Sequence, residues 1–124
     1  MNQLQYKSMI SMLISVTKEK KIIWIEKNGE YTTTIGGCSI HLSSAYDYNV
    51  SVASYILKLY NEEGALFESF VYSEDESTEE YQQLNNLYAS IRDVIYKISE
   101  SENIIFNGLK SLIKRSDECD DLPF

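Results

Sequence analysis

The fold is decided by the stretch IIWIEKNGEYTTTI, residues 22–35. β-Branched and aromatic residues, which strands favour, lie on both sides of Asn28-Gly29. An Asn-Gly pair is the strongest short signal for a hairpin, because a type I′ turn needs a positive φ at both central residues. The stretch therefore predicts two antiparallel strands, whose two-residue loop pairs Lys27 with Glu30, Trp24 with Thr33 and Ile22 with Ile35.

Strand-like sequence continues beyond this hairpin. Gly36-Gly37 interrupts the second strand and predicts a bulge or a bend, after which residues 38–42 resume the alternation. We expect a polar, aromatic loop over 43–48 and a second hairpin from strands 49–60 and 65–72. Centring its turn on Glu62-Glu63 pairs Leu59 with Leu66 and Tyr55 with Phe70. The other face of this hairpin is then also apolar, with Ile56, Tyr60, Phe67 and Val71.

Helical periodicity marks both ends of the chain. Residues 3–17 carry apolar side chains at helical spacing, namely Met9, Met12, Leu13 and Val16, with Ile10 and Ile14 beside them. A longer apolar stripe runs from Leu84 to Ile98, in a helix that begins near Ser77 or Thr78, where Ser77 and Glu80 have capping-box spacing. Ser99 and Glu102 repeat that spacing, so the segment after Ile98 either forms a second helix over 102–115 or continues one bent helix.

These elements predict an α+β domain with an N-terminal helix, a four-stranded antiparallel meander, and one or two C-terminal helices packed on the sheet. We expect one domain over residues 1–115 and an acidic, frayed tail over 116–124.

Charge is distributed unevenly along the 124 residues. The net charge is −8, but the part through Tyr60 has six lysines against four acidic residues, whereas the rest has five basic and fifteen acidic residues. An acidic chain of this kind is not expected to bind nucleic acid through its phosphates. We find neither a signal-peptide pattern nor a membrane-length apolar run, so the cytoplasm is the expected compartment, where a Cys38–Cys119 disulfide is not expected.

Residue types that carry catalysis are few. His41 is the only histidine, and Cys38, three residues before it, is expected on the opposite face of the strand. Gly36-Gly37 lacks the frame of a phosphate-binding loop, and the acidic clusters lack the spacing of a calcium loop. The sequence therefore predicts a non-enzymatic protein with no cofactor and no metal.

Binding to another protein is the expected function, as an inhibitor, an immunity protein or a chaperone-like protein. An acidic surface attracts a basic partner, and tyrosine is enriched at interfaces. The predicted partner-binding residues are Tyr72, Glu74, Asp75, Glu76, Glu79, Glu80 and Tyr81. The surplus apolar face of the second hairpin suggests a homodimer as well.

Two alternatives stay open. The first is a small-molecule-binding module, with a pocket between sheet and helices lined by Trp24, Tyr55 and Tyr88. The second is an acidic mimic of nucleic acid that binds a basic nuclease or regulator.

A weak family resemblance covers most of the chain. Its features are Trp24, the turn Asn28-Gly29-Glu30-Tyr31, the turn at 60–64, and the helix with Leu87-Tyr88 and Arg92. In these the chain resembles small bacterial and phage α+β proteins, and the resemblance implies that fold without implying a function or a site.

Overall fold

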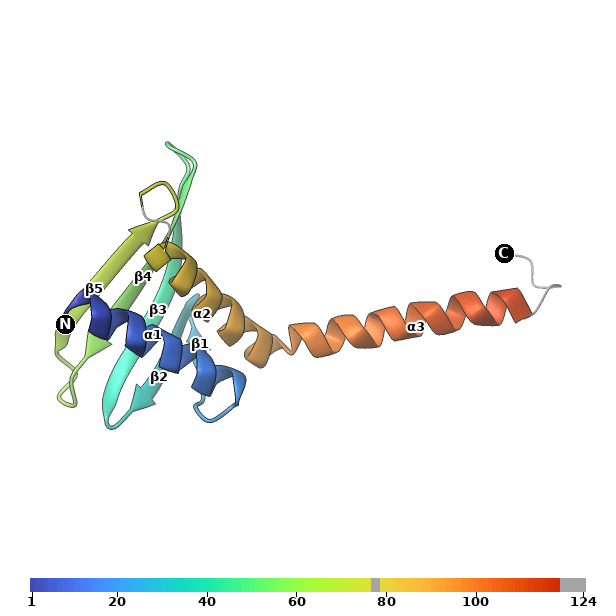
Figure 1. Cartoon of the computed structure of the whole chain (residues 1–124), viewed down its shortest axis with the longest axis horizontal. Helices are drawn as coiled ribbons and strands as arrows, with labels where there is room; N and C mark the ends of the chain where they lie inside the picture. Colours follow the sequence, from blue (N-terminus) through green and yellow to red (C-terminus); the bar gives the residue numbers. More distant parts are fainter. Residues whose placement is uncertain (77–78, 119–124) are drawn as a thin grey trace.

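The computed structural model describes residues 1–76 and 79–118. Five antiparallel strands form one sheet in the order β1-β2-β3-β4-β5. Helices α1 and α2 lie side by side across one face of the sheet, and α3 extends away from this two-layer body (Figure 1). The elements are α1 Gln3–Lys18, β1 Ile25–Lys27, β2 Glu30–Ile35, β3 Cys38–Asp47, β4 Val52–Tyr60, β5 Leu66–Ser73, α2 Glu79–Tyr96 and α3 Ile98–Glu118.

The α+β class and the antiparallel sheet are confirmed, but the sheet has five strands where four were predicted. The difference arises at Gly36-Gly37, which is a hairpin turn between two strands rather than a bulge or a bend within one strand. Ile35 pairs with Cys38, and the two glycines have φ values of 60° and 82°. Two consecutive positive φ values are the requirement of a type I′ turn, so the chain reverses here and begins a new strand.

The predicted loop over 43–48 is wrong, because β3 runs on to Asp47. Ser43 pairs with Ile56 and Tyr46 pairs with Ala53, so the polar segment forms a ladder with β4. The turn follows at residues 48–51, with Ser51 at a φ of 54°. Pairing with a long neighbouring strand thus outweighs the polar composition of this segment.

The first hairpin has the predicted register where it is paired. Lys27 faces Glu30 and Ile25 faces Thr32. Strand β1 begins at Ile25, however, so the predicted Trp24–Thr33 and Ile22–Ile35 pairs lie outside it.

The second hairpin has the predicted turn but not the predicted register. Leu59 pairs with Glu68 instead of Leu66, and Tyr55 pairs with Tyr72 instead of Phe70. Asn61 explains the difference, since its side chain accepts hydrogen bonds from the backbone N–H groups of Glu63 and Ala65 and lengthens the loop. A bulge between Leu59 and Tyr60 then shifts the ladder by one residue.

The predicted helix over residues 3–17 is confirmed within one residue, but the buried face of α1 differs from the predicted apolar stripe. The buried residues are Tyr6, Ile10, Leu13 and Thr17, whereas Met12 is 60% exposed. Asn2 caps the helix in a capping box with Gln5.

The C-terminal segment forms two helices, and the break lies at Lys97 rather than at residues 99–102. Lys97 has a φ of 51°, which ends α2, and α3 begins at the next residue. Helix α2 packs on the sheet as predicted, but α3 does not, because this left-handed residue directs the chain outward (Figure 1). Residues 116–118, predicted as tail, belong to α3; residues 119–124 and the predicted cap Ser77 lie outside the described residues.

The core lies between the sheet and the two helices. Its fully buried members come from α1, β3, β4 and α2, and they are Tyr6, Ile10, Leu42, Leu57, Leu84, Leu87 and Ile91.

Candidate functional site

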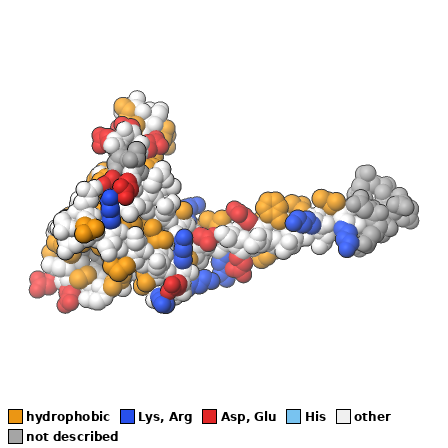
Figure 2. All heavy atoms as spheres, viewed as in Figure 1, with side chains coloured by type: hydrophobic (Ala, Val, Ile, Leu, Met, Phe, Trp, Pro, Cys, Tyr) orange, Lys and Arg blue, Asp and Glu red, His pale blue; other side chains and the backbone are white. Residues whose placement is uncertain are grey.

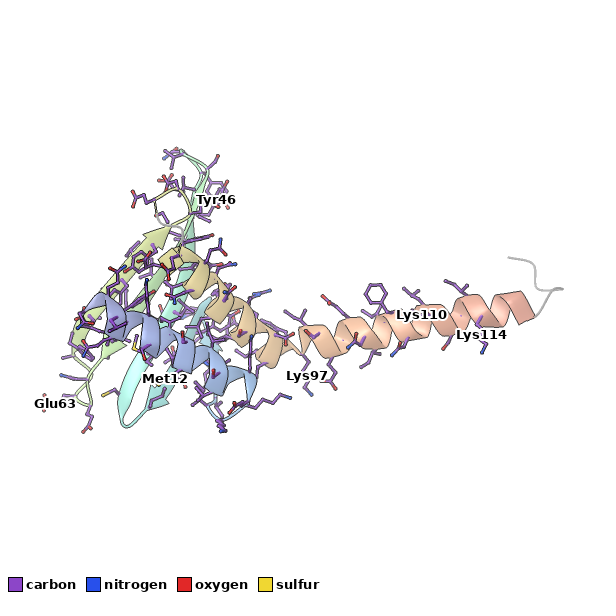
Figure 3. All side chains as sticks on the ribbon, viewed as in Figure 1. Met12, Tyr46, Glu63, Lys97, Lys110 and Lys114 are labelled. Carbon is purple, nitrogen blue, oxygen red and sulfur yellow. The ribbon has the colours of Figure 1, made fainter. Side chains whose placement is uncertain are left out.

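An open apolar groove lies between α1 and the ends of the strands, with a volume of about 440 Å³. We call it the methionine groove. Figure 3 shows Met12 on the outer side of α1, on the same side of the body as the β4–β5 turn with Glu63. The groove is lined by Met1, Met9, Met12, Leu13, Val16, Ile22, Ile35, Cys38, Ser39, Ile40, Leu59, Tyr60 and Phe67.

The groove forms because α1 turns Ile10 and Leu13 into the core and leaves Met9 and Met12 on its flank. Opposite them, the bulge in β5 leaves Phe67 without a pairing partner on β4, and its side chain is 54% exposed. Methionine side chains are flexible and fit surfaces of different shape. The groove can therefore bind apolar side chains of different sizes and shapes.

Polar chemistry at the groove is limited to its rim. Ser39 and Tyr60 also border the groove, but they lie on the open face of the sheet with His41. At the rim, the side chain of Glu62 lies against Gly37, next to the lining residue Cys38, and Glu63 is exposed on the same turn. A ligand of this groove would thus bury apolar groups and meet negative charge beside them.

A second, larger cleft of about 650 Å³ lies where α2 joins α3. Its lining has both signs of charge, from Lys18, Lys20 and Lys97 and from Asp93, Glu100 and Glu102. Asp93 accepts hydrogen bonds from the backbone N–H and the hydroxyl of Ser99, at 2.8 Å and 2.7 Å. These bonds lower the pKa of the Asp93 carboxyl and tie the start of α3 to α2.

The predicted partner-binding residues come together at the junction of β5 and α2. Three of the five carboxylates already have partners within the chain: Glu74 accepts from the Ala53 N–H, Glu79 pairs with Lys7 at 2.9 Å, and Glu80 accepts from Gln3. Asp75 and Glu76 are exposed on the connecting turn.

The two tyrosines of that prediction lie on the inner side of the same region. Tyr72 packs on Tyr6, and Tyr81 packs on Tyr55, with ring centroids 5.5 Å and 5.3 Å apart. Burial raises the pKa of both phenols. This surface stays a prediction.

The predicted pocket residues separate into two groups. Tyr55 and Tyr88 are in ring contact at 5.1 Å, and Tyr55 is buried in the core. Trp24 is also buried, and its indole donates to Thr17. The methionine groove and the α2–α3 cleft are lined by other residues.

His41 and Cys38 lie on opposite faces of β3, as predicted. Cys38 has a free thiol and lines the methionine groove, whereas the His41 ring bonds to the Glu30 carboxylate and packs on Tyr60 on the open face. Cys119 lies outside the described residues. Within the part of the chain that the structure describes, no group of three or more His, Cys, Asp or Glu side chains could hold a metal ion.

Sequence reasoning missed the methionine groove and the exposure of α3. The signal for the groove was present, since Met9, Met12 and Val16 formed the predicted apolar stripe of the first helix. An apolar stripe of this kind is typical of the buried face of a helix. In the structure Tyr6 and Thr17 are buried together with Ile10 and Leu13, so the buried face of α1 is rotated relative to the stripe.

Comparison with protein-family models, with curated proteins and with solved structures found no match to this chain. Among the described residues, no helix is both long and apolar enough to span a membrane.

Proposed function

We propose that this protein is a non-enzymatic binding protein that holds an apolar segment of another protein in the methionine groove. The observation that carries the proposal is the groove itself, which exposes Met1, Met12 and Phe67 beside a well-packed core. Exposed apolar surface of this kind is typical of sites that bind proteins or ligands. Among an inhibitor, an immunity protein and a chaperone-like protein, the exposed apolar groove favours the chaperone-like protein.

The chemistry of the partner follows from the lining and the rim. Apolar side chains would fill the groove, and Lys or Arg next to them would meet Glu62 and Glu63. The net charge of −8 adds long-range attraction for a basic partner.

Peptide display on the full chain tests this proposal. The enriched peptides should carry one or two large apolar residues next to Lys or Arg. Met12→Glu should weaken their binding about tenfold or more, because it places a charge on the groove wall. Leu4→Glu is the matched control, since Leu4 is a highly exposed residue of the same helix that does not line the groove.

Two results would overturn the proposal: enriched peptides that are acidic or lack apolar residues, or binding that survives Met12→Glu. If the groove instead binds an apolar dye and no peptide competes with the dye, the small-molecule-binding alternative replaces the proposal that the groove binds a protein segment.

A further inference from the structure

Helix α3 presents an apolar stripe that nothing covers within the described residues. All side chains from Ser99 to Lys114 are exposed, and the helix extends away from the body (Figure 1). Figure 2 shows most of the visible hydrophobic side chains of α3 along one edge of the helix. At helical spacing they fall within an arc of about 120°; they are Ile105, Phe106, Leu109, Leu112 and Ile113.

The sequence of α3 is a poor helix former when alone. It contains Gly108 in its middle, together with asparagines, serines and β-branched isoleucines, all of which have low helix propensity. In proteins, most of the stability of a helix comes from packing of its amphipathic face rather than from helix propensity. Its stability must therefore come from packing of the stripe.

We infer that the stripe packs against the same stripe of a second copy of this chain, with the two α3 helices antiparallel. The five side chains, at roughly 200 Å² each and half to two-thirds exposed, would bury up to about 1,200 Å² in a symmetric pair, the lower end of specific interfaces. A two-fold interface needs one self-complementary patch, which the stripe provides.

Charge selects the antiparallel orientation. Glu100 and Glu102 lie in the first turns of α3, whereas Lys110 and Lys114 lie in its outer half (Figure 3). A parallel pair would place each of these charges opposite its own copy. An antiparallel pair brings the first turns of one helix, with Glu100 and Glu102, toward Lys110 and Lys114 of the other.

The register follows from the heptad spacing of the stripe. With Ile105 and Leu112 at d positions and Leu109 at an a position, Ile105 packs against Leu109 of the partner subunit, and Glu102 lies opposite Leu112 of the partner subunit.

The dimer goes beyond the proposed function, because it uses no residue of the methionine groove. The open sheet face, the earlier expectation for self-association, is less suited to it, since Lys58 and the His41–Glu30 pair interrupt its apolar residues.

Two adjacent isoleucines provide the first test. Ile105 is 60% exposed on the stripe, and Ile104 is 66% exposed on the opposite side of the helix. Light scattering of the full chain, from about 1 µM to about 100 µM, should show a dimer for the wild type and for Ile104→Glu. Ile105→Glu should raise the dimer dissociation constant about tenfold or more.

Trp24 fluorescence reports whether the body of each variant is folded, since Trp24 is the one tryptophan of the chain and is buried. A wild-type monomer over this range, or equal effects of the two substitutions, would overturn the inference. The peptide test of the groove is unaffected by either result.

Cysteine cross-linking tests the orientation in a Cys38→Ser, Cys119→Ser background. A mixture of Glu102→Cys and Leu112→Cys chains should form a disulfide between the two variants. Glu102→Cys alone should form none, because the two copies of residue 102 would lie about 15 Å apart along the axis. A disulfide from Glu102→Cys alone would show a parallel pair and contradict the antiparallel arrangement.

Discussion

The indole N–H of Trp24 donates a 3.0 Å hydrogen bond to the hydroxyl of Thr17. The same hydroxyl donates to the carbonyl of Leu13 at 2.6 Å, so it is satisfied as donor and as acceptor. Both side chains are buried. This contact joins the last turn of α1 to the residue that precedes β1, and it fixes how the helix connects to the sheet.

Replacing Thr17 by Val should lower the free energy of unfolding by about 1–3 kcal/mol, because the buried Trp24 N–H loses its acceptor. Thr17→Ser is the control, since it keeps the hydroxyl and should cost less. Urea unfolding followed by Trp24 fluorescence measures both. Equal losses for the two variants would show that shape, not the hydrogen bond, matters at this site.

Gly37→Ala should destabilise the protein by roughly 1–2 kcal/mol, because an L side chain at a φ of 82° is strained. Its Cβ would also lie 3.1 Å from the Glu62 side chain, which would have to move. Gly36→Asn is the comparison, since Gly36 has open space around it and asparagine tolerates positive φ. If Gly37→Ala is no worse than Gly36→Asn in urea unfolding, the turn is not constrained as described.

Tyr55 should contribute to alkaline denaturation. Burial raises the pKa of its phenol to about 12, and its hydroxyl donates to Asn85 at 2.6 Å. In the unfolded chain a tyrosine titrates near pH ~10. Between those two pH values the unfolded state loses a proton that the folded state keeps, so the free energy of unfolding falls as pH rises.

Tyr55→Phe should therefore flatten the decrease in unfolding free energy above pH ~10. Denaturant unfolding of the wild type and of Tyr55→Phe at a series of pH values measures this slope. The difference in their free energies of unfolding at neutral pH gives the separate cost of the lost hydrogen bond. A parallel decrease in the two proteins would contradict the assignment.

Asp93→Ala should loosen the junction of α2 and α3, because the Ser99 N–H and hydroxyl lose their common acceptor. Hydrogen exchange at the Ser99 amide should become faster, whereas Asp93→Asn, which keeps a carbonyl acceptor, should retain most of the protection.

The pH dependence of that protection has a definite sign. Because the pKa of Asp93 is lowered, its contribution should be complete above the ordinary carboxyl range and be lost only as pH falls through the lower folded value. Protection of Ser99 that already decreases near neutral pH would contradict this.

Local sequence predicted the helices and two of the turns between strands, because their causes are local. Asn28-Gly29 specifies its turn through its own φ preferences, and the register of the first hairpin follows from it. Gly36-Gly37 was harder to interpret, since glycine serves a bulge or a turn equally well. The long β3–β4 ladder that follows decides for the turn, and that ladder is a tertiary feature.

The candidate sites could be predicted less well than the fold. The acidic segment was evident from charge alone, but the contacts of Glu74, Glu79 and Glu80 within the chain depend on residues far away in the sequence. The methionine groove needs the rotation of α1 about its axis and the bulge at Phe67, and neither is encoded by the local pattern.

The sequence by itself determined the α+β class, the helical segments and the turns at residues 28–29 and 61–64, because periodicity and turn chemistry act over a few residues. The tertiary structure alone decided which apolar stripes are covered. Helices α2 and α3 have similar amphipathic patterns, yet Leu84 and Ile91 are buried whereas Ile105 and Leu112 are exposed. The positive φ of Lys97 directs α3 away from the sheet. Whether an apolar stripe is buried therefore depends on the position of its helix relative to the sheet, and not on the amphipathic pattern of the helix alone.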